Sequence, residues 1–292
     1  MENQGSEYHV PVMLQECIEG LKINPEGIYI DVTFGGGGHS RAILEHLTTG
    51  KLYAFDQDAD AVENARNITN RSFTLIEANF RYLNRFLKLH GIGKIDGLLA
   101  DLGVSSHQIN KAERGFSTRF DAALDMRMDR NTNQTAADVL NTYSEQELHR
   151  VLGMYGEVRN ARTLATALVS ERIQHPFESI GQLKDVLARY ARRGRENKYY
   201  AQVFQALRIE VNEELTALED MLAQTIECMN PGGRLVVMSY HSLEDRIVKS
   251  FVNTGNVQGK LEKDFYGNII RPFEPITRKP LIASEEETSI NN

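Results

Sequence analysis

Cysteine is scarce in this chain, whose 292 residues include only Cys17 and Cys228. The two cysteines lie far apart and in no C-x-x-C pattern, which argues against a disulfide or a zinc site and favours a reducing compartment. Long apolar runs are also missing, so no stretch predicts a signal peptide or a membrane span. We therefore expect a soluble, cytoplasmic protein that binds no metal and no membrane.

Excess positive charge is absent as well. The sequence has 33 Lys and Arg against 40 Asp and Glu, a net charge of −7. This balance does not suggest general nucleic-acid binding, so a polyanionic partner must meet a local basic patch. The length allows one sizeable core and a second module.

The most informative stretch is IYIDVTFGGGGHS, residues 28–40. An apolar run ending at Asp31 breaks into four consecutive glycines and continues into RAILEHL, whose apolar residues recur at helical spacing. Glycine has no Cβ, so the backbone can adopt positive φ and lie against a ligand that the next helix's amides face. The pattern predicts a strand, a ligand-binding turn and a helix.

Two ligands are compatible with this turn. Gly35-x-Gly37-x-x-Ser40 resembles the dinucleotide fingerprint, and Asp56 at the end of the next predicted strand could bind ribose hydroxyls in either case. Asp31 favours the other ligand, because its charge would lie where a pyrophosphate must bind, whereas S-adenosylmethionine carries a cationic ammonium and sulfonium. We favour S-adenosylmethionine and keep NAD as the alternative.

Strands and helices then alternate. KLYAFD, FTLIEANF and IDGLLAD read as strands, and RLVVMSYH supplies a fifth further along. The alternation predicts an α/β fold with a doubly wound, Rossmann-like sheet, mostly parallel, and the irregular stretch after residue 255 is consistent with a closing antiparallel hairpin. Ligands of such sheets bind at the carboxyl ends of the strands. The residues expected at that edge are Asp31, Asp56, Asn79, Phe80 and Asp101.

The alternation stops between Ser106 and Tyr200, where helical patterns and polar connections predict an inserted helical domain. Three capping boxes mark helix starts, pairing Thr135 with Asp138, Ser144 with Glu147, and Ser179 with Gln182. We therefore expect a sheet domain over residues 1–105 and 201–283, the helical insertion over 106–200, and a disordered tail over 284–292.

A basic cluster in the insertion is the best candidate for RNA contact. RYARRGRENKYY groups Arg192, Arg193, Arg195 and Lys198 beside two tyrosines, which combines phosphate-pairing charge with stacking surface. A solvated helix end would show the same composition, so both readings stay open. Arg127, in a looser set of arginines, is a further candidate.

Several motifs, taken together, resemble the ribosomal RNA small subunit methyltransferase H family. In order they are GIYIDVTFGGGGHSRAIL, AFDQD, IDGLLADLGVSSHQ, ERGFS, LDMRMD, FQALRIEVNEEL and GGRLVVMSYHSLEDRIVK. The resemblance implies transfer of a methyl group from S-adenosylmethionine to the N4 amine of a cytidine in 16S rRNA, near the peptidyl-tRNA site of the small ribosomal subunit or its precursor. It also implies that the sheet domain is the methyltransferase domain and the insertion the substrate-recognition domain, in a monomer or homodimer.

The resemblance and the strand-edge positions together suggest the site residues. Those expected to bind the cofactor are Asp31, Gly35, Gly37, Gly38, His39, Asp56, Phe80, Asp101 and Gln108. Cytosine's amine is a poor nucleophile, so an acceptor that pulls on an amine proton would help, and the candidates are Asp101, Ser105 and His241. Neither cysteine lies at a strand end by this edge, so the covalent route to C5-methylation has no evident nucleophile.

The chain also departs from the family pattern. His107 stands where relatives have proline, KYYAQV stands where they carry HPAT, and the basic stretch rich in Arg and Ser is absent after EEETSINN. Two alternative functions stay open, a NAD-dependent oxidoreductase, which the glycine turn allows, and a non-catalytic RNA-binding or assembly factor.

Overall fold

The structure is a computed structural model that describes residues 11–277, 279–284 and 287. Nearly all of the expected disordered tail over 284–292 lies outside the described residues.

The chain forms two compact units. The first combines Met1–Gly103 with Ala217–Asn292, and the second is Val104–Thr216.

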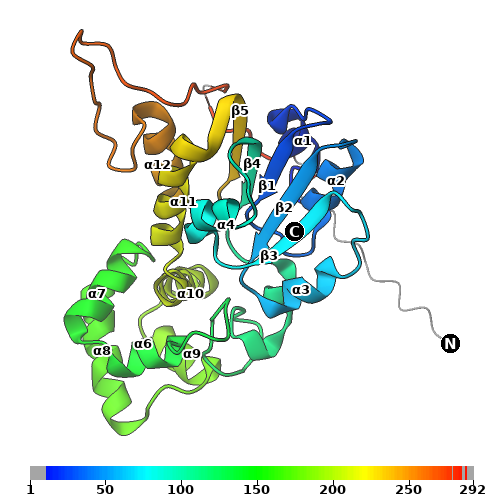
Figure 1. Cartoon of the computed structure of the whole chain (residues 1–292). Helices are drawn as coiled ribbons and strands as arrows, with labels where there is room; N and C mark the ends of the chain where they lie inside the picture. The colour runs from blue at the N-terminus through cyan, green and yellow to red at the C-terminus, as the bar shows by residue number, and fades with distance from the viewer. Residues whose placement is uncertain (1–10, 278, 285–286, 288–292) are drawn as a thin grey trace, which may run out of the picture. The chain divides into compact units, whose positions relative to one another are not determined.

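The first unit is built on a five-stranded sheet with the order β3-β2-β1-β4-β5 (Figure 1). Its strands are β1 Ile28–Asp31, β2 Lys51–Asp56, β3 Phe73–Glu77, β4 Ile95–Asp101 and β5 Met229–Met238. Every pair in the described sheet is parallel, which confirms the predicted doubly wound α/β fold. Both faces are covered, and for this reason the strands read as nearly continuous apolar runs.

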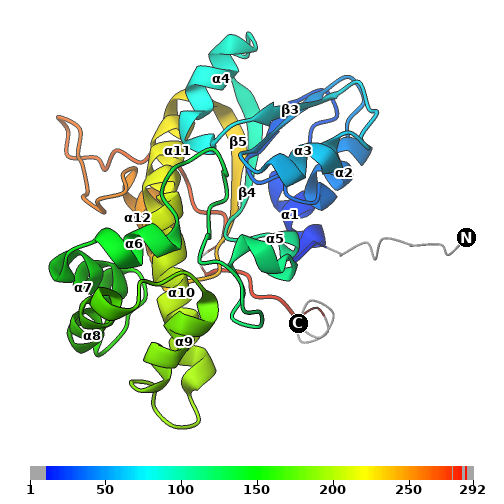
Figure 2. The ribbon, with the colours of Figure 1, turned by 90° about the horizontal axis from the view of Figure 1, so that it is seen from below.

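Helices cover the two faces of this sheet (Figure 2). On one face α1 Leu14–Leu21, α2 Gly38–Glu45 and α3 Ala59–Ala65 pack against the strands. On the other face lie α4 Leu83–Leu89, α11 Glu214–Cys228 and α12 Ser242–Thr254, whose apolar side chains join those of the strands in one core.

The strand register brings the carboxyl ends to one edge. Asp31 is aligned with Leu99 of β4, and Asp101 two residues later is aligned with Met238. Asp56, the last residue of β2, is aligned with Glu77. The side chains that end these strands therefore share the edge where ligands of such sheets bind.

The predicted closing hairpin is wrong for the described residues. No antiparallel strand joins the sheet, and the stretch after α12 contains only an isolated antiparallel bridge between Lys263 and Ile269. The polar sequence NTGNVQGK has no alternation of apolar residues that would pair a strand against a half-buried sheet edge. The strand β5 begins at Met229, earlier than the predicted stretch RLVVMSYH. Its pairing with β4 starts there, shifts register between Ile95 and Gly97, and leaves residues 230–233 as an irregularity.

The second unit is helical. Its helices are α5 Ser106–Asn110, α6 Ala136–Thr142, α7 Glu145–Met154, α8 Ala161–Gln174, α9 Ile180–Ala188 and α10 Glu196–Asn212, with a short 3-10 helix η2 at Ala112–Arg114. All three predicted capping boxes are present, at the starts of α6, α7 and α9. The helix α10 ends at Glu213, whose φ of 48° separates it from α11.

Within the described part of the chain, none of the helices has the length and apolar character needed to cross a membrane.

Candidate active site at the carboxyl edge of the sheet

The glycine turn between β1 and α2 is fixed by steric constraints. Gly35 has a φ of 51° and Gly37 a φ of 76°, values that side chains rarely adopt. A Cβ on Gly37 would lie 2.6 Å from the ring of Phe34, and one on Gly38 would collide with Pro11. Gly37 is the N-cap of α2 and no side chain in the described part of the chain caps this helix, so its first amides can face an anionic group.

Asp31 is the most deeply buried acid at this edge, with 1% of its surface exposed. Its carboxylate accepts hydrogen bonds from the Ser40 hydroxyl at 2.6 Å and from the Thr33 amide at 3.1 Å. Burial nevertheless raises the pKa of Asp31 above its usual value. Hydrogen bonds therefore hold the Asp31 carboxylate in place but only partly offset the cost of burying its charge.

Asp56 closes the glycine turn from β2. One carboxylate oxygen accepts the Gly35 amide at 2.8 Å, and the other accepts the Asp58 amide at 2.9 Å. Burial raises the pKa of Asp56 to about 6. Each oxygen keeps a further lone pair, so the carboxylate can accept hydroxyl donors such as those of a ribose.

Asp101 is held by two neighbours. Its amide donates to the Thr33 hydroxyl at 2.7 Å, and its carboxylate accepts the Tyr240 hydroxyl at 2.7 Å. Burial raises the pKa of Asp101 to about 6, and it also raises the pKa of Tyr240, which therefore stays a protonated donor. Asp101 thus has an oriented carboxylate that is ionised near neutral pH.

His39 lies beside this carboxylate. Its Nε2 is 3.2 Å from the Val12 carbonyl, and because a carbonyl only accepts, Nε2 must carry the proton. Its Nδ1 is 3.7 Å from Asp101 Oδ2. The charge of the His39 ring acts to lower the pKa of Asp101, against the larger effect of burial.

The three carboxylates form an electronegative edge. Asp31 raises the pKa of both Asp56 and Asp101 through charge repulsion. Among the residues that the structure describes, no lysine or arginine forms an ion pair with any of the three. A buried cluster of this kind is costly without a cationic partner. The sulfonium and ammonium of S-adenosylmethionine supply such a partner, and the free amides of α2 suit its carboxylate.

Phe80 is at the same edge, as the first residue of the short 3-10 helix η1 Phe80–Tyr82 that follows β3. It is partly buried and packs against the core cluster between the sheet and α4. The part of the ring left exposed can contact a flat ligand at the edge.

His241, a predicted catalytic candidate, lies at the start of α12, and its catalytic role stays a prediction. It is the N-cap of α12, where Nδ1 accepts the Glu244 amide at 3.4 Å. Its Nε2 lies 3.3 Å from the Glu244 carboxylate, and both side chains are buried. The residue that reaches Asp101 from this segment is the neighbouring Tyr240, which sequence reasoning missed. The only signal was its place two residues beyond β5.

Ser105 and Gln108 belong to the second unit, where they form a fourth capping box. The Ser105 hydroxyl accepts the Gln108 amide at 3.2 Å, and the Gln108 side chain accepts the Ser105 amide at 3.1 Å. These contacts start α5. Their predicted roles in catalysis and cofactor binding stay predictions.

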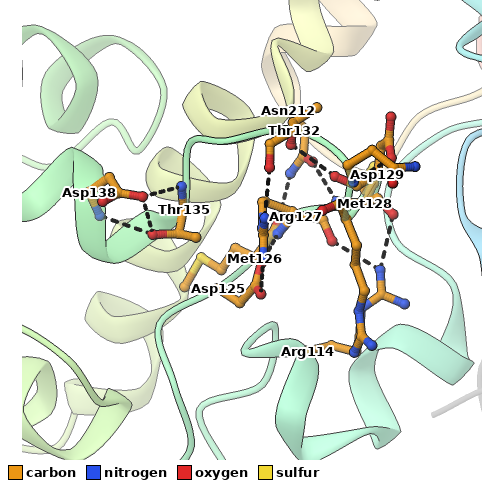
Figure 3. A network of polar contacts seen from close by, with 12 residues as sticks. Arg114, Asp125, Met126, Arg127, Met128, Asp129, Thr132, Thr135, Asp138 and Asn212 are labelled. Carbon is orange, nitrogen blue, oxygen red and sulfur yellow. Dashed lines mark hydrogen bonds and ion pairs between the residues drawn. The ribbon is translucent and has the colours of Figure 1, made fainter.

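Arg127 is extensively engaged within its own loop (Figure 3). Asp125 accepts from its Nε and from one terminal nitrogen, both at 2.8 Å. Its other terminal nitrogen donates to the carbonyls of Arg130 and Thr132. Most of its donors are thus used internally, and the guanidinium braces this loop.

A second arginine, Arg114, is buried and also holds this loop. Arg114 is 1% exposed and donates to the carbonyls of Arg127 and Met128. Asn212 adds a third brace, accepting the Met128 amide at 2.7 Å and donating to the Met126 carbonyl at 2.7 Å. The LDMRMD segment is therefore fixed in one conformation, with Met126 buried at a φ of 61°.

The predicted RNA contacts between α9 and α10 lie at the surface. Arg192, Arg193, Arg195 and Lys198 are all exposed. The turn that holds them uses Gly194 at a φ of 76°, whose amide donates to Glu196 at 3.0 Å. The cluster is accessible to a polyanion, as the prediction requires.

Both cysteines are buried. Cys17 is 2% exposed and Cys228 is 3% exposed. Burial raises the pKa of Cys17 to about 12 and that of Cys228 to about 11, so neither is a thiolate near neutral pH. This agrees with the expectation that neither acts as a nucleophile.

Comparison with known proteins gives consistent matches along nearly the whole chain. A protein from Cytophaga hutchinsonii named ribosomal RNA small subunit methyltransferase H is 63% identical over 285 residues, covering 98% of this chain and 95% of that protein. Proteins of the same name from Christiangramia forsetii and Amoebophilus asiaticus are 54% and 52% identical, covering 98% and 100% of this chain and 94% of each relative. The model of the MraW methylase family matches residues 6–292. The chain therefore belongs to the MraW methylase family.

Proposed function

We propose that this methyltransferase uses S-adenosylmethionine to methylate the N4 amine of a cytidine in 16S rRNA, near the peptidyl-tRNA site of the small ribosomal subunit. The names of its relatives support ribosomal RNA of the small subunit as the substrate. The motif resemblance supports the base and the atom. The observation that carries the proposal is the oriented Asp101 carboxylate at the edge of the sheet.

The donor site is assigned to the first unit. Amides at the start of α2 bind the methionine carboxylate, Asp56 accepts the ribose hydroxyls, and Phe80 contacts the adenosine. When bound, S-adenosylmethionine supplies an electrophilic methyl group on a sulfonium. Asp31 and Asp101 stabilise that positive charge from a buried position.

Asp101 also acts on the acceptor. Its carboxylate accepts a hydrogen bond from the cytosine amine, which raises the electron density on nitrogen and aligns it for direct displacement. After transfer the methylated amine loses a proton, which the Asp101 carboxylate can accept. Tyr240 keeps the carboxylate oriented throughout.

The test is mass spectrometry of nucleosides from small ribosomal subunits incubated with the protein and isotope-labelled donor. We expect labelled N4-methylcytidine at a single 16S rRNA position. Label on C5 of cytosine, on a ribose or on another base would reject the proposal. Tight RNA binding with no incorporated label would instead identify a non-catalytic assembly factor.

The NAD alternative needs a separate measurement. We expect S-adenosylhomocysteine to raise the melting temperature of the chain, because it fills the edge beside the glycine turn. Stabilisation by NADH without any effect of S-adenosylhomocysteine would favour an oxidoreductase.

A further inference from the structure

Two fully exposed aromatic rings stand at the tip of a short hairpin after α12. We call residues 260–271 the aromatic hairpin; it begins the loop drawn in orange beyond α12 in Figure 1. Phe265 is 97% exposed and Tyr266 is 86% exposed. Large apolar side chains presented together in this way mark a binding surface rather than a folding contact.

The hairpin has a defined conformation. Lys263 and Ile269 form an antiparallel bridge, and the Ile270 amide donates to the Glu262 carbonyl at 2.9 Å. At the tip, Gly267 adopts a φ of 85°, which a side chain would resist.

Asp264 organises this turn. Its carboxylate accepts the Tyr266 amide at 2.9 Å, the Asn268 amide at 2.8 Å and the Asn268 side chain at 3.0 Å. These bonds lower the pKa of Asp264 below its usual value, because they favour the charged form.

The base of the hairpin is attached to α12. Phe273 contacts the buried Phe251 with ring centroids 5.3 Å apart, and Pro272 packs against Gly255 so closely that a Cβ there would lie 2.5 Å away. Asn256 donates to the Lys260 carbonyl at 2.6 Å and accepts its amide at 3.0 Å. These contacts hold the base of the hairpin, while the two rings at its tip stay in solvent.

We infer that the aromatic hairpin binds unpaired nucleotides of the RNA substrate by stacking bases on Phe265 and Tyr266. The two rings meet at 87° with centroids 5.5 Å apart. Bases stacked on their faces cannot be parallel to each other, as they are in a helix, so the tip fits splayed single-stranded nucleotides. The inference rests on the proposed function, because it takes RNA as the substrate.

The charge of the hairpin is compatible with RNA. Residues 260–271 carry three exposed cations, Lys260, Lys263 and Arg271, against the exposed carboxylates of Glu262 and Asp264, a local excess of positive charge in an acidic chain. The Asp264 carboxylate is moreover engaged by the Tyr266 and Asn268 amides. The two rings are sufficient for two bases, since each stacked base alone contributes measurably to affinity.

The test measures binding of the full chain to 16S rRNA in small ribosomal subunits over a series of salt concentrations. With Phe265→Ala and Tyr266→Ala together, we expect affinity to fall about tenfold or more, with the slope against salt unchanged, because stacking releases no counterions. Tyr82→Ala is the matched control, since Tyr82 is a 48%-exposed tyrosine of the same unit, and it should bind like wild type.

Two further variants separate stacking from simple apolar contact. Exchanging the rings, Phe265→Tyr with Tyr266→Phe, should keep wild-type affinity, whereas Leu at both positions should not restore it. S-adenosylhomocysteine should bind every variant equally, which shows that the sheet unit remains folded.

Several results would overturn the inference. Unchanged RNA affinity of the double alanine variant, or wild-type affinity with leucine, would show that stacking is absent. A dimer seen by light scattering that dissociates in the double variant, with RNA affinity intact, would assign the tip to a second copy of the chain. A wild-type chain that neither binds nor methylates small-subunit RNA would instead remove the proposed function as well.

Discussion

At the scale of single residues, the site depends on buried acids that have no lysine or arginine partner in the described part of the chain. Asp31, Asp56 and Asp101 are placed by hydroxyls and amides. Burial raises the pKa of all three. A bound cation relieves the cost of burying them, so the same geometry that destabilises the empty chain favours the donor.

Asp56→Ala tests the ribose contact. We expect at least about tenfold weaker binding of S-adenosylhomocysteine, since hydrogen bonds to a charged acceptor are each worth about 1.5–3 kcal/mol. Isothermal titration calorimetry measures the affinity. Glu77→Ala is the control, because Glu77 ends the adjacent strand but is exposed. Equal affinities for wild type and Asp56→Ala would remove Asp56 from the site.

The pH dependence of methyl transfer tests Asp101. Its carboxylate must be ionised to accept the amine proton, and its pKa is about 6, so the rate should fall as pH drops through about 6. Tyr240→Phe removes a hydrogen bond that lowers this pKa, so the acidic limb should move to higher pH. A limb that stays in place would show that another group controls it.

The free energy of unfolding should depend on Asp101 in the opposite sense to the rate: the ionised carboxylate favours methyl transfer but destabilises the fold. The folded pKa of Asp101 is above its unfolded value, so its favourable contribution is present below pH 4 and is lost as pH rises through about 6. At pH 7.5, Asp101→Asn should therefore raise the free energy of unfolding of the ligand-free chain, by roughly 1–3 kcal/mol. Urea denaturation measures it, and at pH 4 the gain should vanish. A variant less stable than wild type at pH 7.5 would contradict this reasoning.

At the scale of elements, the LDMRMD loop shows an arginine that is engaged within its own loop, while its predicted RNA contact stays a prediction. Asp125 holds Arg127 through two parallel hydrogen bonds, and Arg114 and Asn212 fix the same backbone (Figure 3). Paired bonds of this kind are geometrically specific. The loop is thus a rigid element of the helical unit.

Asp125→Ala should lower the free energy of unfolding by about 1–3 kcal/mol, because it leaves a partly buried guanidinium without its acceptor. Urea denaturation near pH 7 measures the change. The pKa of Asp125 is lowered, so its contribution is present above the unfolded value near 4 and lost as pH falls below it. Glu113→Ala is the control, because its ion pair with Arg130 is exposed and worth little. If both substitutions lowered the free energy of unfolding equally, the pairing of Asp125 with Arg127 would not stabilise the loop.

At the scale of the whole molecule, the proposed substrate is an acidic polymer and the chain is acidic too. The net charge is −7, so the proposed affinity for RNA would have to come from local surfaces. The exposed cluster between α9 and α10 offers charge, and the aromatic hairpin offers stacking. The two surfaces should differ in their response to salt, because only charge neutralisation releases counterions.

Replacing Arg192, Arg193 and Arg195 with Ala together should weaken binding to small-subunit RNA and make its salt dependence shallower. Each lost phosphate contact reduces the slope by about 0.7–0.9. Filter binding at several salt concentrations measures both. Arg66, Arg85 and Lys88, exposed residues of the other unit, provide a control with the same change of charge. An unaltered slope would show that these three arginines make no phosphate contacts.

The sequence alone determined the features that depend on local order. Glycines that need positive φ, capping boxes at α6, α7 and α9, and apolar runs that end in Asp31, Asp56 and Asp101 predicted the turn, the helices and the ligand edge. These succeeded because backbone geometry and hydrogen-bonding periodicity act over a few residues.

Only the tertiary structure decided which groups meet. It brought Tyr240 to Asp101 across 139 positions, gave His241 to the start of α12, and engaged Arg127 within its own loop. It also left the predicted closing hairpin outside the sheet, with its aromatic tip exposed. Contacts between residues distant in sequence depend on packing and strand register, which no local pattern of residue types encodes.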